Sequence, residues 1–267
     1  MSFERLMPGT LEWDLYYANH ASRYQFALTQ LENKKSRYIL DAATGVGFGA
    51  HLLGNNNIGK IIAIDRDKTT INFAEQKYKH EAITFVVDDC ETFEQSKQYY
   101  PFDAVISFET LEHLPNPKLF IANCFECLLP GGQLIISTPN QLVSSPDGNL
   151  NWEFHEKEYT AAELVELLEN NGFVDIKIYG QQFTAIGILR QQMRAELYRI
   201  NSNPFNRLGK WIQHTFKRVS FSAVLPEQPE DFEIIEYTNL NDIVTKNTKG
   251  PFVLIAVCKK NSPILNY

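Results

Sequence analysis

The feature that most constrains this chain is a short apolar run that breaks directly into a glycine-rich loop. Residues 38–49 read Tyr-Ile-Leu-Asp-Ala-Ala-Thr-Gly-Val-Gly-Phe-Gly. An apolar run followed by closely spaced glycines is typical of a buried strand that turns into a ligand-binding loop, because glycine lets the backbone approach a ligand closely. The segment therefore predicts an α/β fold with a nucleoside-containing cofactor at the end of this strand.

The spacing of the glycines separates this loop from a dinucleotide site. A dinucleotide-binding loop reads Gly-x-Gly-x-x-Gly and places backbone amides against a pyrophosphate. Here Gly45, Gly47 and Gly49 alternate, and Asp41 precedes them at the end of the strand. A carboxylate repels a pyrophosphate but attracts an amino group, so the loop favours a cofactor with an amino-acid tail.

A second apolar run supports this interpretation. Residues 60–65 read Lys-Ile-Ile-Ala-Ile-Asp. Asp65 follows the first glycine by about 20 residues, the distance at which a strand-terminal carboxylate accepts the hydroxyls of a ribose.

These motifs resemble the class I S-adenosylmethionine-dependent methyltransferases, whose first motif commonly reads hydrophobic-Leu-Asp-x-Gly-x-Gly-x-Gly. The resemblance covers residues 38–180 and departs from the family at Ala43, where a glycine is usual. It implies that residues 83–90, 102–109 and 133–138 are the third, fourth and fifth strands. The cofactor-binding residues that it implies are Tyr24, Asp41, Ala43, Gly45, Gly47, Asp65, Arg66, Asp89, Cys90 and Phe108.

Three of these residues have specific implied roles. By the resemblance, Asp89 accepts a hydrogen bond from the adenine amine, and the backbone amide of Cys90 meets the adenine ring. Tyr24 has two interpretations: with Arg23 it reaches the carboxylate of the cofactor, or it is a packing aromatic beside a solvated arginine.

The order of the apolar runs predicts a Rossmann-like sheet of seven strands, mostly parallel, with an antiparallel last strand and helices on both faces. We expect an N-terminal lid helix in residues 1–36, the core in residues 37–180 and 251–260, and a helical cap insertion in residues 181–250. Thr160, Glu163 and Gly172 mark the start and end of one core helix. Residues 186–200 and 205–216 predict two amphipathic helices in the cap.

Charge and composition limit the partners of the protein. The chain has 267 residues, 44% of them hydrophobic, and a formal net charge of −7, so a full core is expected and nucleic acid is a disfavoured partner. Residues 190–218 carry seven basic residues and one acidic residue. This segment has three interpretations: a solvated helix face, a site for an anionic small-molecule substrate, or a peripheral membrane contact. The sequence leaves the oligomeric state open.

The chain shows no sign of secretion or membrane insertion. Its first residues lack the pattern of a signal peptide, and nowhere do about 18 apolar residues follow one another. We expect a cytoplasmic protein. The cysteines at positions 90, 124, 127 and 258 are expected to be reduced, packed thiols.

A group of carboxylates and histidines follows the fourth and fifth predicted strands. Glu109, Glu112 and His113 are spaced so that one helical turn would place them on the same face. His155 follows the fifth predicted strand, so we expect it at the same edge of the sheet. The pattern resembles the metal-dependent O-methyltransferases that modify the 3′-terminal ribose of small RNAs, and its first half resembles ubiquinone-biosynthesis O-methyltransferases. The resemblance implies that Glu109, Glu112, His113 and His155 bind a divalent metal, Mg²⁺ or Mn²⁺, with zinc and iron open as alternatives.

The sequence thus predicts transfer of a methyl group from S-adenosylmethionine to a small-molecule acceptor, with a hydroxyl oxygen as the preferred target. A hydroxyl bound to a cation deprotonates more easily than a free one. Without a metal, His113 or His155 is the candidate general base, and Glu109 is the third catalytic candidate. The alternatives are an N-methyltransferase, an RNA 3′-terminal ribose methyltransferase and a non-catalytic scaffold.

Overall fold

A computed structural model describes residues 7–31, 37–202, 226–243 and 250–262 of the chain. The residues group into two compact units: Met1–Ser22 with Phe183–Glu233, and Arg23–Gln182 with Ile234–Tyr267. We describe each unit by itself.

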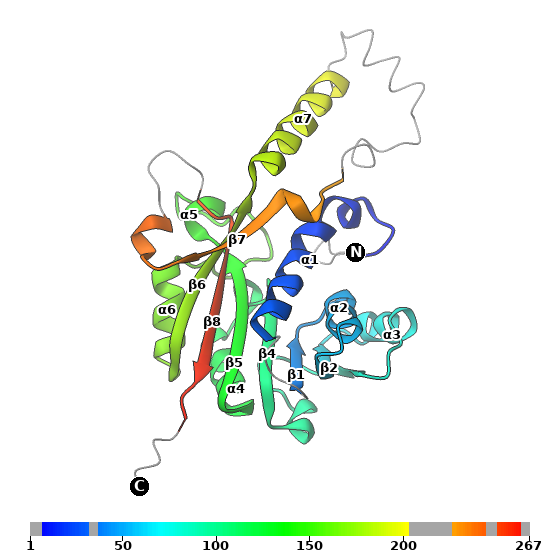
Figure 1. Cartoon of the computed structure of the whole chain (residues 1–267), viewed down its shortest axis with the longest axis vertical. Helices are drawn as coiled ribbons and strands as arrows, with labels where there is room; N and C mark the ends of the chain where they lie inside the picture. Colours follow the sequence, from blue (N-terminus) through cyan, green and yellow to red (C-terminus); the bar gives the residue numbers. More distant parts are fainter. Residues whose placement is uncertain (1–6, 32–36, 203–225, 244–249, 263–267) are drawn as a thin grey trace. The chain divides into compact units, whose positions relative to one another are not determined.

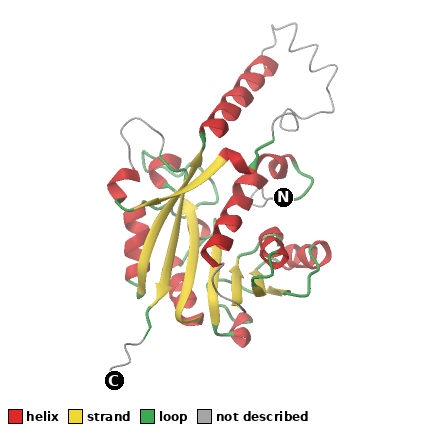
Figure 2. Ribbon diagram, in the orientation of Figure 1, coloured by secondary structure: helices red, strands yellow, loops and turns green. Residues whose placement is uncertain are grey.

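The larger unit is built on one sheet, shown in yellow in Figure 2. Its order is β3-β2-β1-β4-β5-β8-β6-β7. Strands β1 to β5 pair in parallel, and β8 runs antiparallel to both β5 and β6. The strands are β1 Arg37–Ala42, β2 Gly59–Asp65, β3 Ile83–Val87, β4 Phe102–Phe108, β5 Leu128–Pro139, β6 Phe173–Phe183, β7 Phe232–Tyr237 and β8 Val253–Lys260.

The Rossmann-like prediction is confirmed, with one strand more than the seven expected. The additional strand is β7, which lies beside β6 at the edge of the sheet and within the segment for which only helices were predicted. Of its residues only Phe232 is buried. An edge strand with one buried side chain lacks the continuous apolar run by which the inner strands are identified.

Two apolar cores lie on opposite faces of the sheet, because successive side chains of a strand point to opposite sides. Leu40 and Val105 belong to one core, whereas their neighbours Ile39 and Ile106 belong to the other. The first core includes residues of α4 and α6, and the second includes residues of α1 and α2 (Figure 1). The helices are α1 Leu11–Leu31, α2 Phe48–Asn55, α3 Lys68–Lys77, α4 Pro117–Cys127, α5 Gln141–Ser144, α6 Ala161–Glu169 and α7 Ala185–Ser202, with short 3₁₀ turns η1 Ser96–Tyr99, η2 Leu111–His113, η4 Pro229–Asp231 and η5 Leu240–Ile243.

The start of α6 shows how the sequence fixes a helix boundary. The Thr160 hydroxyl accepts from the backbone amide of Glu163, and the Glu163 carboxylate accepts from the backbone amide of Thr160. This reciprocal capping box satisfies amides that the first helical turn leaves without partners. The predicted helix start is confirmed, and Gly172 follows the helix with a positive φ of 88°.

The smaller unit contains α7, which carries part of the basic segment. The Arg190 guanidinium forms an ion pair with Asp231 at 3.1 Å, and Arg194 lies 3.6 Å from Glu227. Two of the seven basic residues therefore face acidic residues of the same unit. The helix predicted for residues 205–216 lies outside the described residues, so the interpretations of the basic segment stay predictions.

Among the described residues, no helix has the combination of length and apolar character that is needed to cross a bilayer. Cys124, Cys127 and Cys258 are buried, Cys90 is half-buried, and all four are free thiols. Burial raises the pKa of Cys127 to about 12, which keeps this thiol protonated.

Candidate active site

The predicted cofactor residues meet at one edge of the sheet. Because β1, β2, β3 and β4 are parallel, their carboxyl ends lie at the same edge. Asp41 and Asp65 stand at the ends of β1 and β2, Asp89 follows β3, and Phe108 ends β4. The structure thus brings the three predicted acidic residues to consecutive strand ends.

Asp41 is fully buried at the end of β1. Its Oδ1 accepts a hydrogen bond from the Tyr24 hydroxyl at 3.1 Å, and its Oδ2 accepts from the Thr44 hydroxyl at 2.5 Å. Burial raises the pKa of Asp41 to about 6, although the bonds from Thr44 and Tyr24 oppose this rise, and the negative charge of Asp65 adds to it. A buried carboxylate of this kind favours a positively charged partner.

Asp65 is buried at the end of β2 and accepts two backbone amides. Its Oδ2 accepts from Gly45 at 3.1 Å, and its Oδ1 accepts from Asp67 at 2.9 Å. These bonds connect the glycine loop after β1 to the end of β2. Arg66, also predicted at this site, is exposed beside Asp65.

The loop between β1 and α2 has left-handed backbone at three positions, with φ values of 63° at Ala43, 57° at Gly45 and 83° at Gly47. The two glycines serve different purposes. A Cβ atom at Gly45 would meet nothing within 4 Å, which is consistent with space for a ligand. A Cβ atom at Gly47 would lie 2.7 Å from Ala74 Cβ and 2.8 Å from the Phe85 ring. The close packing of these two side chains therefore requires glycine at this position.

The two carboxylates after β3 differ in environment. Asp88 is buried, where its Oδ2 accepts from the backbone amide and the hydroxyl of Ser96, both at 2.7 Å. Asp89 is exposed, and its Oδ1 accepts from the backbone amide of Glu91. The exposed position of Asp89 suits a ligand contact, whereas Asp88 holds the turn together. Burial raises the pKa of Cys90 to about 12, in keeping with a role for its backbone rather than its thiol.

The side of this edge next to α1 is closed by aromatic rings. Tyr24 packs edge-on against Phe108 with ring centroids 5.0 Å apart, and both side chains are buried. Burial raises the pKa of Tyr24, and the neighbouring Asp41 raises it further. Arg23 is also buried, and its Nη1 donates to Gln181 Oε1 at 2.6 Å. Arg23 is thus not a solvated arginine.

A second group of side chains lies beyond β4 and β5, on η2 and on the loop that precedes α6. Backbone hydrogen bonds hold these segments together. The carbonyl of Glu112 accepts from the amides of Glu156 and Lys157, and the Nδ1 atom of His113 is 2.9 Å from the carbonyl oxygen of Phe154. These contacts place His155 next to η2.

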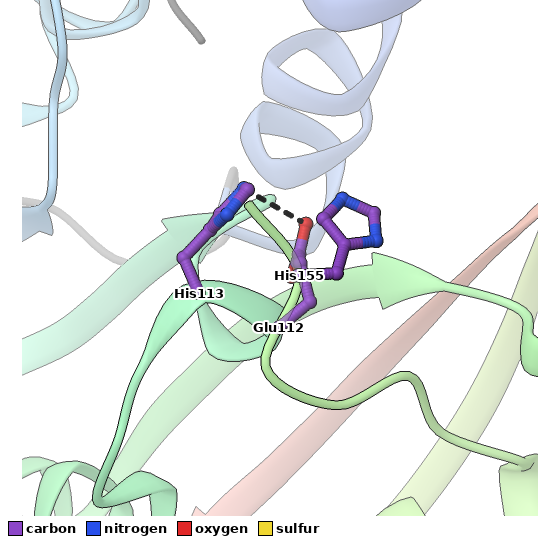
Figure 3. Close-up of side chains that lie close together, drawn as sticks. All are labelled: Glu112, His113 and His155. Carbon is purple, nitrogen blue, oxygen red and sulfur yellow. Dashed lines mark ion pairs between the residues drawn. The ribbon is translucent and has the colours of Figure 1, made fainter. Parts of the chain in front are cut away.

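Glu112, His113 and His155 form a compact cluster of possible metal ligands (Figure 3). Each offers one ligand atom, and these atoms lie within 4.8 Å of one another. The two imidazole rings are 5.0 Å apart between centroids, and His113 Nε2 is 3.8 Å from Glu112 Oε1. One carboxylate and two imidazoles are a donor set used by zinc and by non-haem iron, so the residues present fit a divalent metal.

Glu109 does not belong to this cluster as the helical spacing predicted. Its φ is 52°, and the helical turn begins only at Leu111, so Glu109 does not share a helix face with Glu112 and His113. Instead, Glu109 Oε1 accepts from the Ser137 hydroxyl at 2.7 Å. The left-handed backbone directly after β4 breaks the regular spacing on which the prediction depended.

Glu112 is the buried member of the cluster, with 1% of its surface exposed. Burial raises its pKa well above the ordinary value, and the nearby charge of Glu109 raises the pKa further. A hydrogen bond from the Thr138 hydroxyl at 3.1 Å and the positive charge of Arg23 act in the opposite direction. A buried carboxylate beside a second carboxylate is an arrangement that a bound cation stabilises.

Some residues of this region carried no sequence signal. The buried carboxylate of Glu158 accepts from His155 Nδ1 at 2.7 Å and from the hydroxyl groups of Ser144 and Ser145. Burial raises the pKa of Glu158, but these three hydrogen bonds and the electrostatic attraction of His155 together outweigh it, so the pKa lies below its ordinary value. The spacing of His155 and Glu158 is common on any surface segment, and only the fold brings the two serines to the carboxylate.

Known proteins similar to this chain include S-adenosylmethionine-dependent methyltransferases. A family model described as methyltransferase domain matches residues 16–178. A probable S-adenosylmethionine-dependent methyltransferase of Mycolicibacterium smegmatis is 34% identical over 173 residues, which cover 64% of this chain and 63% of that protein. The solved structure of an S-adenosylmethionine-dependent methyltransferase from Archaeoglobus fulgidus matches this chain with a TM-score of 0.57 and 20% identity. The match covers 94% of this chain and 95% of that protein, and it shows that the two share a fold.

Two other relatives act on different acceptor atoms. A ubiquinone biosynthesis O-methyltransferase of Rattus norvegicus is 26% identical over 222 residues, covering 74% of this chain and 56% of that protein. A phosphoethanolamine N-methyltransferase of Triticum aestivum is 26% identical over 157 residues, covering 55% of this chain and 30% of that protein. The chain thus spans less than two thirds of the length of these curated relatives. The family match, the fold and the acidic residues at the strand ends all agree. The chain therefore belongs to the class I S-adenosylmethionine-dependent methyltransferases.

Proposed function

We propose that this protein transfers the methyl group of S-adenosylmethionine to a hydroxyl oxygen of a small-molecule acceptor. The observation that carries this proposal is the cluster of Glu112, His113 and His155 at the carboxyl edge of the sheet. The cofactor residues follow β1, β2 and β3, and the cluster follows β4 and β5 along the same edge. The acceptor then lies at the cluster, on the β4 and β5 side of the cofactor.

The cluster supplies what a hydroxyl acceptor requires. An alcohol or phenol must lose its proton as its oxygen attacks the methyl carbon. The bond between that carbon and the sulfonium sulfur breaks at the same time, and its electron pair stays on the sulfur. A divalent metal held by Glu112, His113 and His155 would lower the pKa of a hydroxyl bound to it. If no metal is held, His155 accepts the proton of the acceptor as a general base.

The surroundings of the cluster favour a small organic acceptor over a nucleic acid. Trp152 is 63% exposed and stacks on His155 with ring centroids 6.2 Å apart, and the neighbouring Phe154 is 41% exposed. Leu150, on the same loop, is 43% exposed. An apolar rim of this kind contacts rings or aliphatic groups, whereas the sugar-phosphate backbone of a nucleic acid is bound through basic side chains.

An amine acceptor is the second candidate, because the wheat relative is named as a phosphoethanolamine N-methyltransferase. A neutral amine attacks the methyl group without a metal, so its methylation would be insensitive to chelator. The dependence on metal and the position of the new methyl group therefore separate the two candidates.

The test uses the full chain, treated with chelator and then incubated with isotopically labelled S-adenosylmethionine and a panel of phenols, aliphatic alcohols and amines. We expect O-methyl products by mass spectrometry, with turnover restored by Mn²⁺ or Mg²⁺. Glu112→Gln is expected to lose this turnover, whereas Glu169→Gln, at an exposed position at the end of α6, retains it. N-methyl products at full rate in the presence of chelator would overturn the proposal in favour of an amine acceptor.

A further inference from the structure

We propose that Glu158 is the positioning residue of this site: it orients His155 and fixes the ring nitrogen that faces Glu112 and His113. The inference rests on the proposed function in one respect, because it assigns the oriented nitrogen to the metal or to the acceptor proton. The orientation itself follows from contacts within the chain.

Glu158 is enclosed by donors. Its side chain has no exposed surface, its Oε1 lies 2.7 Å from His155 Nδ1, and its Oε2 accepts from the hydroxyl groups of Ser144 and Ser145. Three donors on one buried carboxylate satisfy it without a lysine or arginine. The bonds from the two serines alone would hold the loop. The bond to His155 in addition connects the carboxylate to the cluster of metal-ligand side chains.

The bond to Glu158 decides the tautomer of His155. An ionised carboxylate only accepts hydrogen bonds, so the proton of the neutral imidazole must be on Nδ1, and Nε2 carries the lone pair. The same inference applies to His113, whose Nδ1 donates to the backbone carbonyl of Phe154 at 2.9 Å. Both rings thus present Nε2 as the nitrogen able to bind a metal or to accept a proton.

The support of Glu158 belongs to the scaffold rather than to the loop alone. Ser144 ends α5 and Ser145 caps it, and this helix follows directly from β5. Asn140, at the start of α5, forms a parallel bridge with Tyr159, next to Glu158. The serines and the carboxylate are therefore held together by backbone pairing at the end of the sheet, and His155 receives its orientation from there.

The substitution Glu158→Gln tests the inference. The glutamine keeps the size of the side chain, and its carbonyl oxygen can still accept from the two serines. Its amide group then faces His155 Nδ1 as a donor, so the proton of the imidazole has to move to Nε2. The matched control is Glu156→Gln, the same change at an exposed position two residues away.

The first measurement is nitrogen-15 NMR of the histidine side chains in the full chain without metal, with His155→Asn used to assign the signal. We expect the Nδ1–H tautomer at His155 in the wild type and in Glu156→Gln, and the Nε2–H tautomer in Glu158→Gln. A wild-type His155 protonated on Nε2, or an unchanged tautomer in Glu158→Gln, would overturn the inference. The wild-type spectrum alone is decisive if Glu158→Gln does not fold.

The second measurement is calorimetric titration with Mn²⁺. We expect the affinity to fall about 10- to 100-fold in Glu158→Gln and to stay unchanged in Glu156→Gln. S-adenosylmethionine affinity should be the same in all three proteins, which separates the positioning of His155 from a general loss of structure. If the wild type shows the Nδ1–H tautomer but binds no Mn²⁺, the metal part of the proposed function fails and the role of Glu158 stands.

Discussion

Gly49 of α2 lies directly against the ring of Tyr24 in α1, so that a Cβ atom at residue 49 would be 1.9 Å from Tyr24 Cζ. The missing side chain lets the tyrosine ring lie between the two helices, and from there its hydroxyl group reaches Asp41 at 3.1 Å. Gly49 belongs to the glycine motif of the loop, and its lack of a side chain also allows Tyr24 to reach Asp41.

The first prediction concerns this contact. Gly49→Ala should displace the Tyr24 ring, lower the free energy of unfolding by about 1–3 kcal/mol because the site becomes overpacked, and weaken S-adenosylmethionine binding about tenfold. Thermal unfolding and calorimetry measure the two effects. Tyr24→Phe is the control, since it removes the hydroxyl group without overpacking. Wild-type stability in Gly49→Ala would mean that the ring has room to move.

The second prediction is a pH dependence that originates at Asp41. Burial raises the pKa of this carboxyl group to about 6, so the free protein holds its proton below that pH. A cationic amino group favours the ionised form, and its binding below pH 6 must therefore release a proton. We expect S-adenosylhomocysteine affinity to be constant above pH 7 and to fall towards tenfold per pH unit below pH 6.

Calorimetry between pH 5 and pH 8 measures this dependence. Asp41→Asn is expected to bind weakly at every pH, with no change across pH 6, because the amide does not titrate. A wild-type affinity that stays constant down to pH 5 would show that Asp41 does not meet the amino group.

The third prediction separates the adjacent carboxylates Asp88 and Asp89. Asp88→Asn places an amide donor among the donors of Ser96 and Asp89, and should lower the free energy of unfolding by about 1–3 kcal/mol. Asp89→Asn, at an exposed position, should leave stability unchanged and weaken cofactor binding. Thermal unfolding and calorimetry on both variants are the measurements, and the opposite assignment of effects would refute the proposed adenine contact.

The fourth prediction concerns the apolar rim of the acceptor site. Trp152→Ala should raise the KM for the acceptor about 2- to 12-fold, because one aromatic contact worth about 0.5–1.5 kcal/mol is lost. The KM for S-adenosylmethionine should stay unchanged. Leu129→Ala is the control, because this exposed apolar residue lies near the start of β5, before the strand reaches the carboxyl edge. An acceptor KM that is equal in both variants would place the acceptor elsewhere.

The parallel strands β1 to β5 were predictable because each is an apolar run with an acid or a turn residue at its end. Residues 38–42 and 60–65 give β1 and β2, and Thr160 with Glu163 gives the start of α6. Strand β7 was not predicted, because one buried residue at a sheet edge leaves almost no pattern. The packing of Gly47 was not predicted, because its neighbours Ala74 and Phe85 are far away in sequence.

The sequence by itself determined the parallel strands β1 to β5 of the sheet and their acidic ends, because both depend on local patterns of apolar and turn-forming residues. Only the tertiary structure decided which side chains act together. A left-handed backbone turned Glu109 towards Ser137, hydrogen bonds between two loops brought His155 to Glu112, and backbone pairing after β5 carried Ser144 and Ser145 to Glu158. Such contacts join residues that are distant in the chain, and no local spacing encodes them.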